Sequence, residues 1–178
     1  MKKRTPVNKT RVLSLCSIFS ALGVIILYMG ALVEVLDLSM AVLASLLVII
    51  AVIEIGGIYP WLVYAVTSVL SLLLLPNKFG AVVYFAFAGF YPILKEKIER
   101  VKGLVCLISK FAIFNLCLLA MFGAAKALSL PLTFEFSIWV MAVSLNILFA
   151  FYDFALTRLI TAYICVWRKK LKIDKWKL

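Results

Sequence analysis

The chain has 178 residues, of which 66% are hydrophobic and 15% charged, and its formal net charge at neutral pH is +11. This composition excludes a soluble globular domain and is typical of a polytopic membrane protein, here expected to form one integral membrane domain over residues 1–178. The positive charge does not indicate nucleic-acid binding, because the basic residues lie in the tails and one internal loop, where membrane topology places them. Histidine is absent, and the four cysteines lie in apolar runs without CxxC pairing, so neither a metal site nor a disulfide framework is predicted.

Six apolar runs predict an all-α bundle of six transmembrane helices. The first run, residues 12–33, exceeds the apolar region of about 7–15 residues in a secretory signal, and we expect it to be retained as a span. At about 1.5 Å per residue it is long enough to cross a bilayer core of about 30 Å. The remaining spans are expected at 38–55, 59–75, 79–94, 103–128 and 136–167.

The distribution of basic residues predicts the orientation of this bundle. With six spans and a cytoplasmic N-terminus, all of the 19 Lys and Arg residues except Lys78 and Lys126 lie toward the cytoplasmic ends of the spans. Such a bias is the positive-inside pattern of membrane proteins. We therefore expect a multi-pass protein of the cell membrane, embedded in the lipid bilayer, with both termini in the cytoplasm.

Small residues mark one side of the first span. At helical spacing Ser14, Ser17 and Ala21 fall on one face, with Ser20 beside them. Small side chains allow helices to approach closely in lipid, where no hydrophobic effect drives them together. This face predicts either packing inside the protein's own bundle or a docking surface for a partner membrane protein.

Catalytic signatures are missing from the sequence. It contains no GxxxxGK[ST] phosphate loop, Gly-rich dinucleotide fingerprint, HExxH or GxSxG motif. The sequence therefore predicts a protein that is not an enzyme and has no cofactor. If it transports a solute, the energy must come from an ion gradient or from a separate ATPase.

A few polar residues lie inside the predicted spans, where they are costly and often functional. Asn115 and Asn146 could meet near the midplane, either as an amide pair between helices or as ligand contacts. Lys110 and Asp153 could form a buried charge pair, with Glu54 as a possible third member. Alternatively, one of these carboxylates could shuttle protons in an ion-driven transporter.

Three short corners between spans converge on the outer side in the predicted topology. They carry polar residues next to aromatic ones, which suits an apolar pocket with a few polar contacts, although short external turns can also be polar without binding anything. The residues at these corners include Glu34, Asp37, Ser39, Asn77, Lys78, Thr133, Glu135 and Trp139. With two residues from the spans added, the candidate ligand-binding residues are Asp37, Asn77, Lys78, Tyr84, Glu135, Trp139 and Asn146.

Three segments carry a resemblance to a known family. Ser17-Ile-Phe-Ser-Ala21 stands in the place of a small-xxx-small motif, Leu36-Asp-Leu-Ser-Met-Ala-Val-Leu43 enters the second span, and Ser68-Val-Leu-Ser-Leu-Leu-Leu-Leu-Pro76 ends the third. With six spans in nearly the whole chain, it resembles the substrate-binding S component of energy-coupling-factor transporters.

The resemblance implies a function and a set of partners. An S component captures a vitamin or similar small molecule from outside and docks on a coupling transmembrane subunit driven by two ATPase subunits. Carried over, it implies that Ser17 and Ala21, with Ser14 and Ser20 alongside, form the docking face, and that the outer corners form the pocket. The alternatives are a six-span membrane scaffold of a cell-envelope complex and an ion-coupled carrier that uses Asp153 or Glu54.

Overall fold

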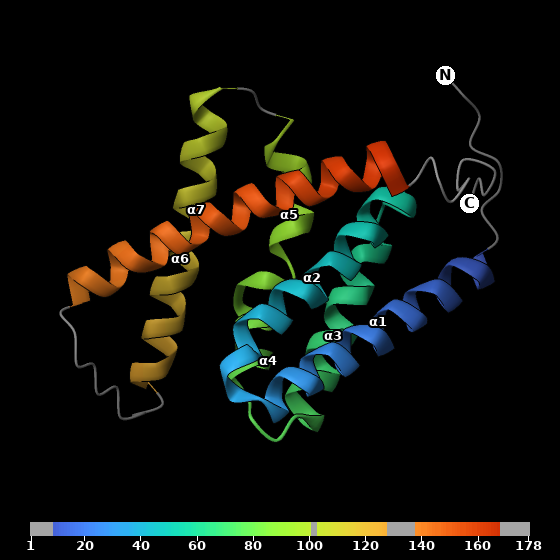
Figure 1. The fold of residues 1–178 in the computed structure, drawn as a ribbon, viewed down its shortest axis with the longest axis horizontal. Helices are drawn as coiled ribbons and strands as arrows, with labels where there is room; N and C mark the ends of the chain where they lie inside the picture. The colour runs from blue at the N-terminus through green and yellow to red at the C-terminus, as the bar shows by residue number, and fades with distance from the viewer. Residues whose placement is uncertain (1–8, 101–102, 128–137, 168–178) are drawn as a thin grey trace. The chain divides into compact units, whose positions relative to one another are not determined.

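The protein is described from a computed structural model, which describes residues 9–100, 103–127 and 138–167, without the side chains of Glu34, 124–127, 138–139 and 166–167. All regular structure in these ranges is helical, as the sequence predicts (Figure 1). The elements are α1 (Lys9–Leu32), the 3₁₀ turn η1 (Glu34–Leu36), α2 (Asp37–Glu54), α3 (Tyr59–Leu74), α4 (Phe79–Val83), the π-helix η2 (Tyr84–Ala88), α5 (Tyr91–Ile98), α6 (Leu104–Ala127), α7 (Ile138–Ala162) and the π-helix η3 (Tyr163–Trp167).

Four described stretches are long and apolar enough to cross a membrane. They are Lys9–Leu32, Asp37–Glu54, Leu104–Gly123 and Val140–Cys165, which lie where the first, second, fifth and sixth spans are expected. The third expected span corresponds to α3, a shorter apolar helix. The structure therefore has the helical and apolar character of a membrane protein, while the count of six spans and the sides of the termini stay predictions.

The region expected as the fourth span differs from a single helix over 79–94. It is broken into α4, η2 and α5, with a turn at Gly89 and Phe90. Two backbone features account for the break. Pro92 has no N–H and cannot donate to the carbonyl of Ala88, and the N–H of Gly89 donates to the carbonyl of Tyr84, five residues back, at 2.8 Å.

The chain divides into two compact units, one of Met1–Glu96 with Ile160–Leu178 and one of Lys97–Leu159. In the first unit α1 packs along α2 and α3 (Figure 1). The buried side of α1 carries small residues, including Cys16, Ser20, Gly23 and Gly30. A Cβ atom at Gly30 would lie 2.8 Å from Cβ of Met40, so α1 and α2 approach more closely than a side chain at position 30 would allow.

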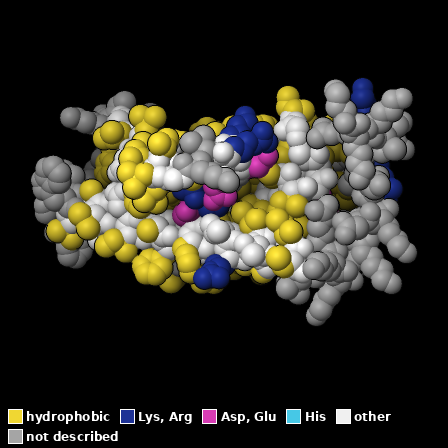
Figure 2. All heavy atoms as spheres, turned by 90° about the horizontal axis from the view of Figure 1, so that it is seen from above, with side chains coloured by type: hydrophobic (Ala, Val, Ile, Leu, Met, Phe, Trp, Pro, Cys, Tyr) yellow, Lys and Arg dark blue, Asp and Glu magenta, His cyan; other side chains and the backbone are white. Residues whose placement is uncertain are grey.

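The second unit is built from α6 and α7, which run in opposite directions along their contact. Phe149 of α7 stacks on Phe114 of α6 with ring centroids 4.5 Å apart, and it meets Phe111 edge to face at 5.2 Å. The outer sides of both helices are apolar and exposed, as Leu119 and Phe151 illustrate at 69% each. Figure 2 shows apolar side chains in patches on the face that it draws, with a group of charged side chains near the middle. Such surfaces suit contact with lipid or with other membrane helices.

Candidate functional site

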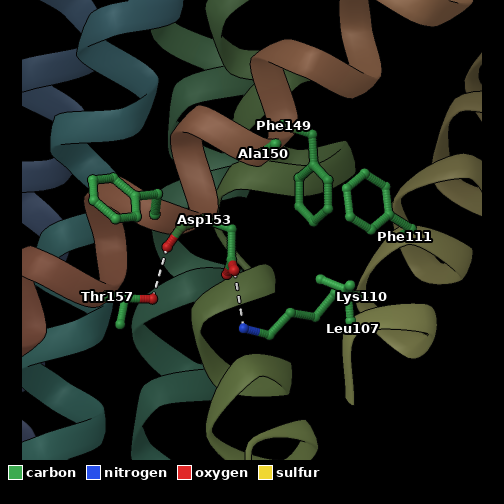
Figure 3. Close-up of a pocket in the computed structure, with 8 residues that line it drawn as sticks. Leu107, Lys110, Phe111, Phe149, Ala150, Asp153 and Thr157 are labelled. Atoms are coloured by element: carbon green, nitrogen blue, oxygen red, sulfur yellow. Dashed lines mark hydrogen bonds and ion pairs between the residues drawn. The ribbon is translucent and has the colours of Figure 1, made fainter. Parts of the chain in front are cut away.

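The polar centre of the second unit is Lys110. Its Nζ donates to Oε1 of Glu99 at 2.8 Å and to Oδ2 of Asp153 at 2.9 Å. The expected pair between Lys110 and Asp153 is therefore present (Figure 3). Glu99 is a further partner of this ammonium group. Glu54, expected as a possible third member, belongs to the first unit, where it accepts a hydrogen bond from the hydroxyl of Tyr163 at 3.3 Å.

Burial is unequal among these three charges. The side chains of Lys110 and Asp153 are 9% and 19% exposed, whereas that of Glu99 is 39% exposed. Lys110 and Asp153 come from two apolar helices and neutralise each other there, because an isolated ion in lipid or in a protein interior is costly. Glu99, from the connector before α6, contacts the same ammonium from the exposed side.

A cavity of about 190 Å³ adjoins this ion pair. Its walls are mainly aromatic and aliphatic, with the charges of Lys110 and Asp153 on one side (Figure 3). The hydroxyl of Thr157 donates to the backbone carbonyl of Asp153 at 2.8 Å, a bond within α7 on the polar side of the cavity. The lining residues are Leu107, Lys110, Phe111, Phe149, Ala150, Asp153, Phe154 and Thr157.

The two asparagines of the second unit also meet, as the sequence suggests. Asn115 Nδ2 donates to Asn146 Oδ1 at 2.9 Å, and Asn146 Nδ2 donates to Asn115 Oδ1 at 3.1 Å. Each Nδ2 also donates to a carbonyl of its own helix, that of Phe111 or that of Ala142. Because both donors of the Asn146 amide are engaged, a ligand could use Asn146 as a donor only by breaking one of these two bonds.

At the corner between α1 and α2, the side chain of Asp37 is buried and accepts a hydrogen bond from the turn between α3 and α4. Nδ2 of Asn77, from the turn between α3 and α4, donates to Oδ2 of Asp37 at 3.1 Å. Oδ1 of Asn77 accepts from the N–H of Phe79 at 3.0 Å. A Cβ atom at Gly80 would lie 3.0 Å from Oδ1 of Asp37, so the absence of a side chain there leaves room for the carboxylate. Asp37 and Asn77 thus join two turns that are 40 residues apart.

The other expected ligand residues lie apart from this pair or outside the description. Nζ of Lys78 donates to the carbonyls of Leu75 at 2.5 Å and Leu73 at 3.4 Å, at the end of α3. Tyr84 is fully buried in the core of the first unit. Glu135 and the side chain of Trp139 lie outside the described residues.

The small-residue face of α1 divides into two parts. Ser14, Ser17 and Ala21 are exposed, whereas Ser20 is buried and its hydroxyl lies 3.5 Å from the carbonyl of Val63 in α3. Ser20 therefore packs inside its own bundle, because it follows the spacing of Cys16 and not that of Ser17. Its expected place beside an exposed docking face is not supported.

Sequence reasoning missed two contacts in these regions. Glu99 was not foreseen as a partner of Lys110, because it lies 11 residues away across a charged connector with no helical spacing to relate them. The bond from the hydroxyl of Tyr64 to the carbonyl of Phe85, at 2.8 Å, depends on the local π-helix, which no sequence pattern indicated.

Within the ranges that the structure describes, no group of three or more His, Cys, Asp or Glu residues could hold a metal ion. Comparison of the chain with protein-family models, with curated proteins and with solved structures found no match.

Proposed function

We propose that the chain is the substrate-capture subunit of an energy-coupling-factor type uptake transporter. In this proposal it is a six-span protein of the cell membrane with both termini in the cytoplasm, and it has no enzymatic activity of its own. The observation that carries the proposal is the exposed position of Ser14, Ser17 and Ala21 on α1.

The chemistry of this face favours contact with another helix. The hydroxyls of Ser14 and Ser17 donate to the carbonyls of Thr10 and Leu13, at 3.0 and 3.1 Å. Because their polar groups are satisfied within α1, the surface that remains is small and flat. It can be removed from lipid by a partner helix without leaving a hydroxyl unbonded. The proposed partner is a coupling transmembrane subunit that works with two ATPase subunits.

The proposed ligand is a vitamin or similar small molecule, captured at the extracellular side. The corner of Asp37 and Asn77 supports this location, because a buried carboxylate and an amide are bonded there. Lys78 follows Asn77 in the chain, with its ammonium group on the backbone carbonyls at the end of α3. Tyr84, Glu135, Trp139 and Asn146 complete the proposed ligand set. For Tyr84 and Asn146 this requires that binding rearranges the core position of the first and the amide pair of the second.

Co-purification tests the docking proposal. Tagged protein is taken from native membranes in mild detergent, and the proteins and small molecules that accompany it are identified by mass spectrometry. We expect a coupling subunit with ATPases to accompany the protein, and we expect the double variant Ser17→Phe with Ala21→Phe to lose these subunits.

The matched control is Ile18→Phe with Leu22→Phe, which enlarges two exposed side chains on another side of the same turns. Retention of the subunits by the Ser17 and Ala21 variant would refute the docking role. Recovery of cell-envelope proteins alone would favour a scaffold.

A second candidate function is an ion-coupled carrier, favoured by the Glu99, Lys110 and Asp153 cluster. Two carboxylates share one ammonium group beside an aromatic cavity, and the more buried of them, Asp153, lies in the middle of an apolar helix. Uptake into vesicles without ATP that collapses with the proton gradient, and is lost in Asp153→Asn, would support this function. Uptake that requires ATP and survives the substitution would exclude it.

A further inference from the structure

The π-helix η2 leaves one carbonyl oxygen without its usual helical donor. In an α-helix the N–H of Gly89 would donate to the carbonyl of Phe85, four residues back. It donates instead to the carbonyl of Tyr84 at 2.8 Å. In an apolar environment a carbonyl oxygen left in this way must find another donor.

Tyr64 of α3 supplies that donor. Its hydroxyl donates to the carbonyl of Phe85 at 2.8 Å, which takes the place of the absent amide. Its ring stacks on the ring of Phe85, with centroids 6.4 Å apart and planes inclined by 11°. The side chain from one helix therefore completes the hydrogen bonding of another.

Gly89 makes room for this arrangement. A Cβ atom at position 89 would lie 2.6 Å from Cδ2 of Tyr64 and 2.9 Å from Cε1 of Tyr84. Real side chains essentially never approach so closely, so the ring of Tyr64 can occupy this place only because residue 89 has no side chain. The hydroxyl, the ring and the glycine together hold the π register.

We propose that Tyr64 is a latch on a conformational switch in the segment Phe79–Ile98. In the state described here, the Tyr64 hydroxyl bonds the carbonyl of Phe85 and Gly89 bonds Tyr84. In the second state, the Gly89 amide moves to the carbonyl of Phe85 in ordinary α register and the Tyr64 hydroxyl is displaced. The amide of Ala88 then donates to the carbonyl of Tyr84, as α register requires, so both carbonyl oxygens have a donor in each state.

The switch connects two regions of the first unit. On one side of η2, α4 carries Gly80, which lies against the carboxylate of Asp37. On the other side, α5 carries Lys95, which is buried with its Nζ 6.0 Å from the ring centroid of Tyr91. Because a change of register in η2 alters the rotation of α4 relative to the start of α5, the latch would couple the Asp37 corner to Lys95 of α5. π-turns within helices are often found at functional sites.

Fluorine NMR on the full chain in lipid nanodiscs tests the latch. The probe is 4-fluorophenylalanine at position 85, where the side chain is 51% exposed and tolerates a small substituent. We expect Tyr64→Phe, which lacks only the hydroxyl, to raise the population of a second resonance by about 2- to 10-fold, the usual effect of one hydrogen bond. Gly89→Ala should shift the spectrum further in the same direction, because its methyl group displaces the Tyr64 ring. Tyr59→Phe, which removes a hydroxyl from the same helix, is the matched control.

A second measurement keeps the proposal testable if Gly89→Ala fails to fold. The pattern of amide hydrogen exchange over the peptide spanning residues 84–94 should change in Tyr64→Phe and remain unchanged in Tyr59→Phe. A single unshifted resonance in Tyr64→Phe would overturn the proposal. Exchange equal to that of the Tyr59→Phe control would overturn it as well.

Discussion

The two compact units hold their helices together by opposite means. In the first, α1 approaches α2 and α3 through glycine and small side chains, so that backbone meets side chain directly at Gly23 and Gly30. In the second, α6 and α7 meet through large rings, an amide pair and an ion pair. Close packing tolerates no added volume, whereas paired polar groups tolerate no loss of a partner. The two units should therefore fail under different substitutions.

The largest effect is expected at the ion pair of the second unit. Lys110→Met leaves Asp153 without its cation in a mostly buried position, and removing one member of such a pair typically costs about 3–5 kcal/mol. The thermal unfolding midpoint in detergent should fall strongly. Combining Lys110→Met with Asp153→Leu should recover most of the loss, because the charge that remains, on Glu99, is partly exposed to solvent. Glu99→Gln, at the exposed edge, should change the midpoint least.

The next largest effect is expected from added volume in the first unit. Gly30→Ala places a methyl group 2.8 Å from Cβ of Met40, and we expect a cost of about 1–3 kcal/mol from overpacking. Gly123→Ala in α6 is the control, because a Cβ atom there meets nothing within 4 Å. The control should be neutral or slightly stabilising, since alanine favours a helix more than glycine does. Equal unfolding midpoints for the two variants would contradict the close packing of α1 on α2.

A smaller loss is expected at the corner of the first unit. Asn77→Ala removes the donor to the buried carboxylate of Asp37, and a hydrogen bond to a charged group contributes about 1.5–3 kcal/mol. We expect the lower end of this range, because Asn77 is only partly buried. Urea-assisted unfolding in detergent measures the change. Asn77→Asp should be worse than Asn77→Ala, since it sets two carboxylates against each other.

The smallest effect is expected at the amide pair of the second unit. A double-mutant cycle of Asn115→Leu and Asn146→Leu should give a coupling energy of about 0.6 kcal/mol, the mean of measured membrane pairs. A coupling energy near that of the Lys110 and Asp153 pair would show that the second unit depends on its amides as much as on its charges.

Long apolar helices were predictable from the sequence because their signal accumulates over many residues. Hydropathy and length located α1, α2, α6 and α7, and both polar pairs between α6 and α7 followed from their depth along the helices. The break at η2 was not predictable, because it depends on which carbonyl accepts the Gly89 amide and on the Tyr64 ring from another helix.

The buried position of Ser20 on α1 was also not predictable from the sequence. Ser17 and Ser20 are three residues apart, which in a helix of about 3.6 residues per turn leaves their directions about 60° apart. Composition gives no reason to assign one outward and the other inward. The phase of α1 is decided by Cys16, Gly23 and Gly30, which form the stripe that fits against α2 and α3. Glu135 and Trp139 of the expected ligand set remain predictions.

The bond between Glu54 and Tyr163 joins residues separated by 109 positions within the first unit. A ribosome releases Glu54 long before Tyr163, so the helices α1, α2 and α3 must remain without this contact while the whole second unit is synthesised. Synthesis of the first unit therefore begins before that of the second unit and ends after it. A nascent chain halted after residue 159 should hold the α1 to α3 packing but leave the cytoplasm-proximal end of α2, as predicted here, accessible to proteases and chaperones.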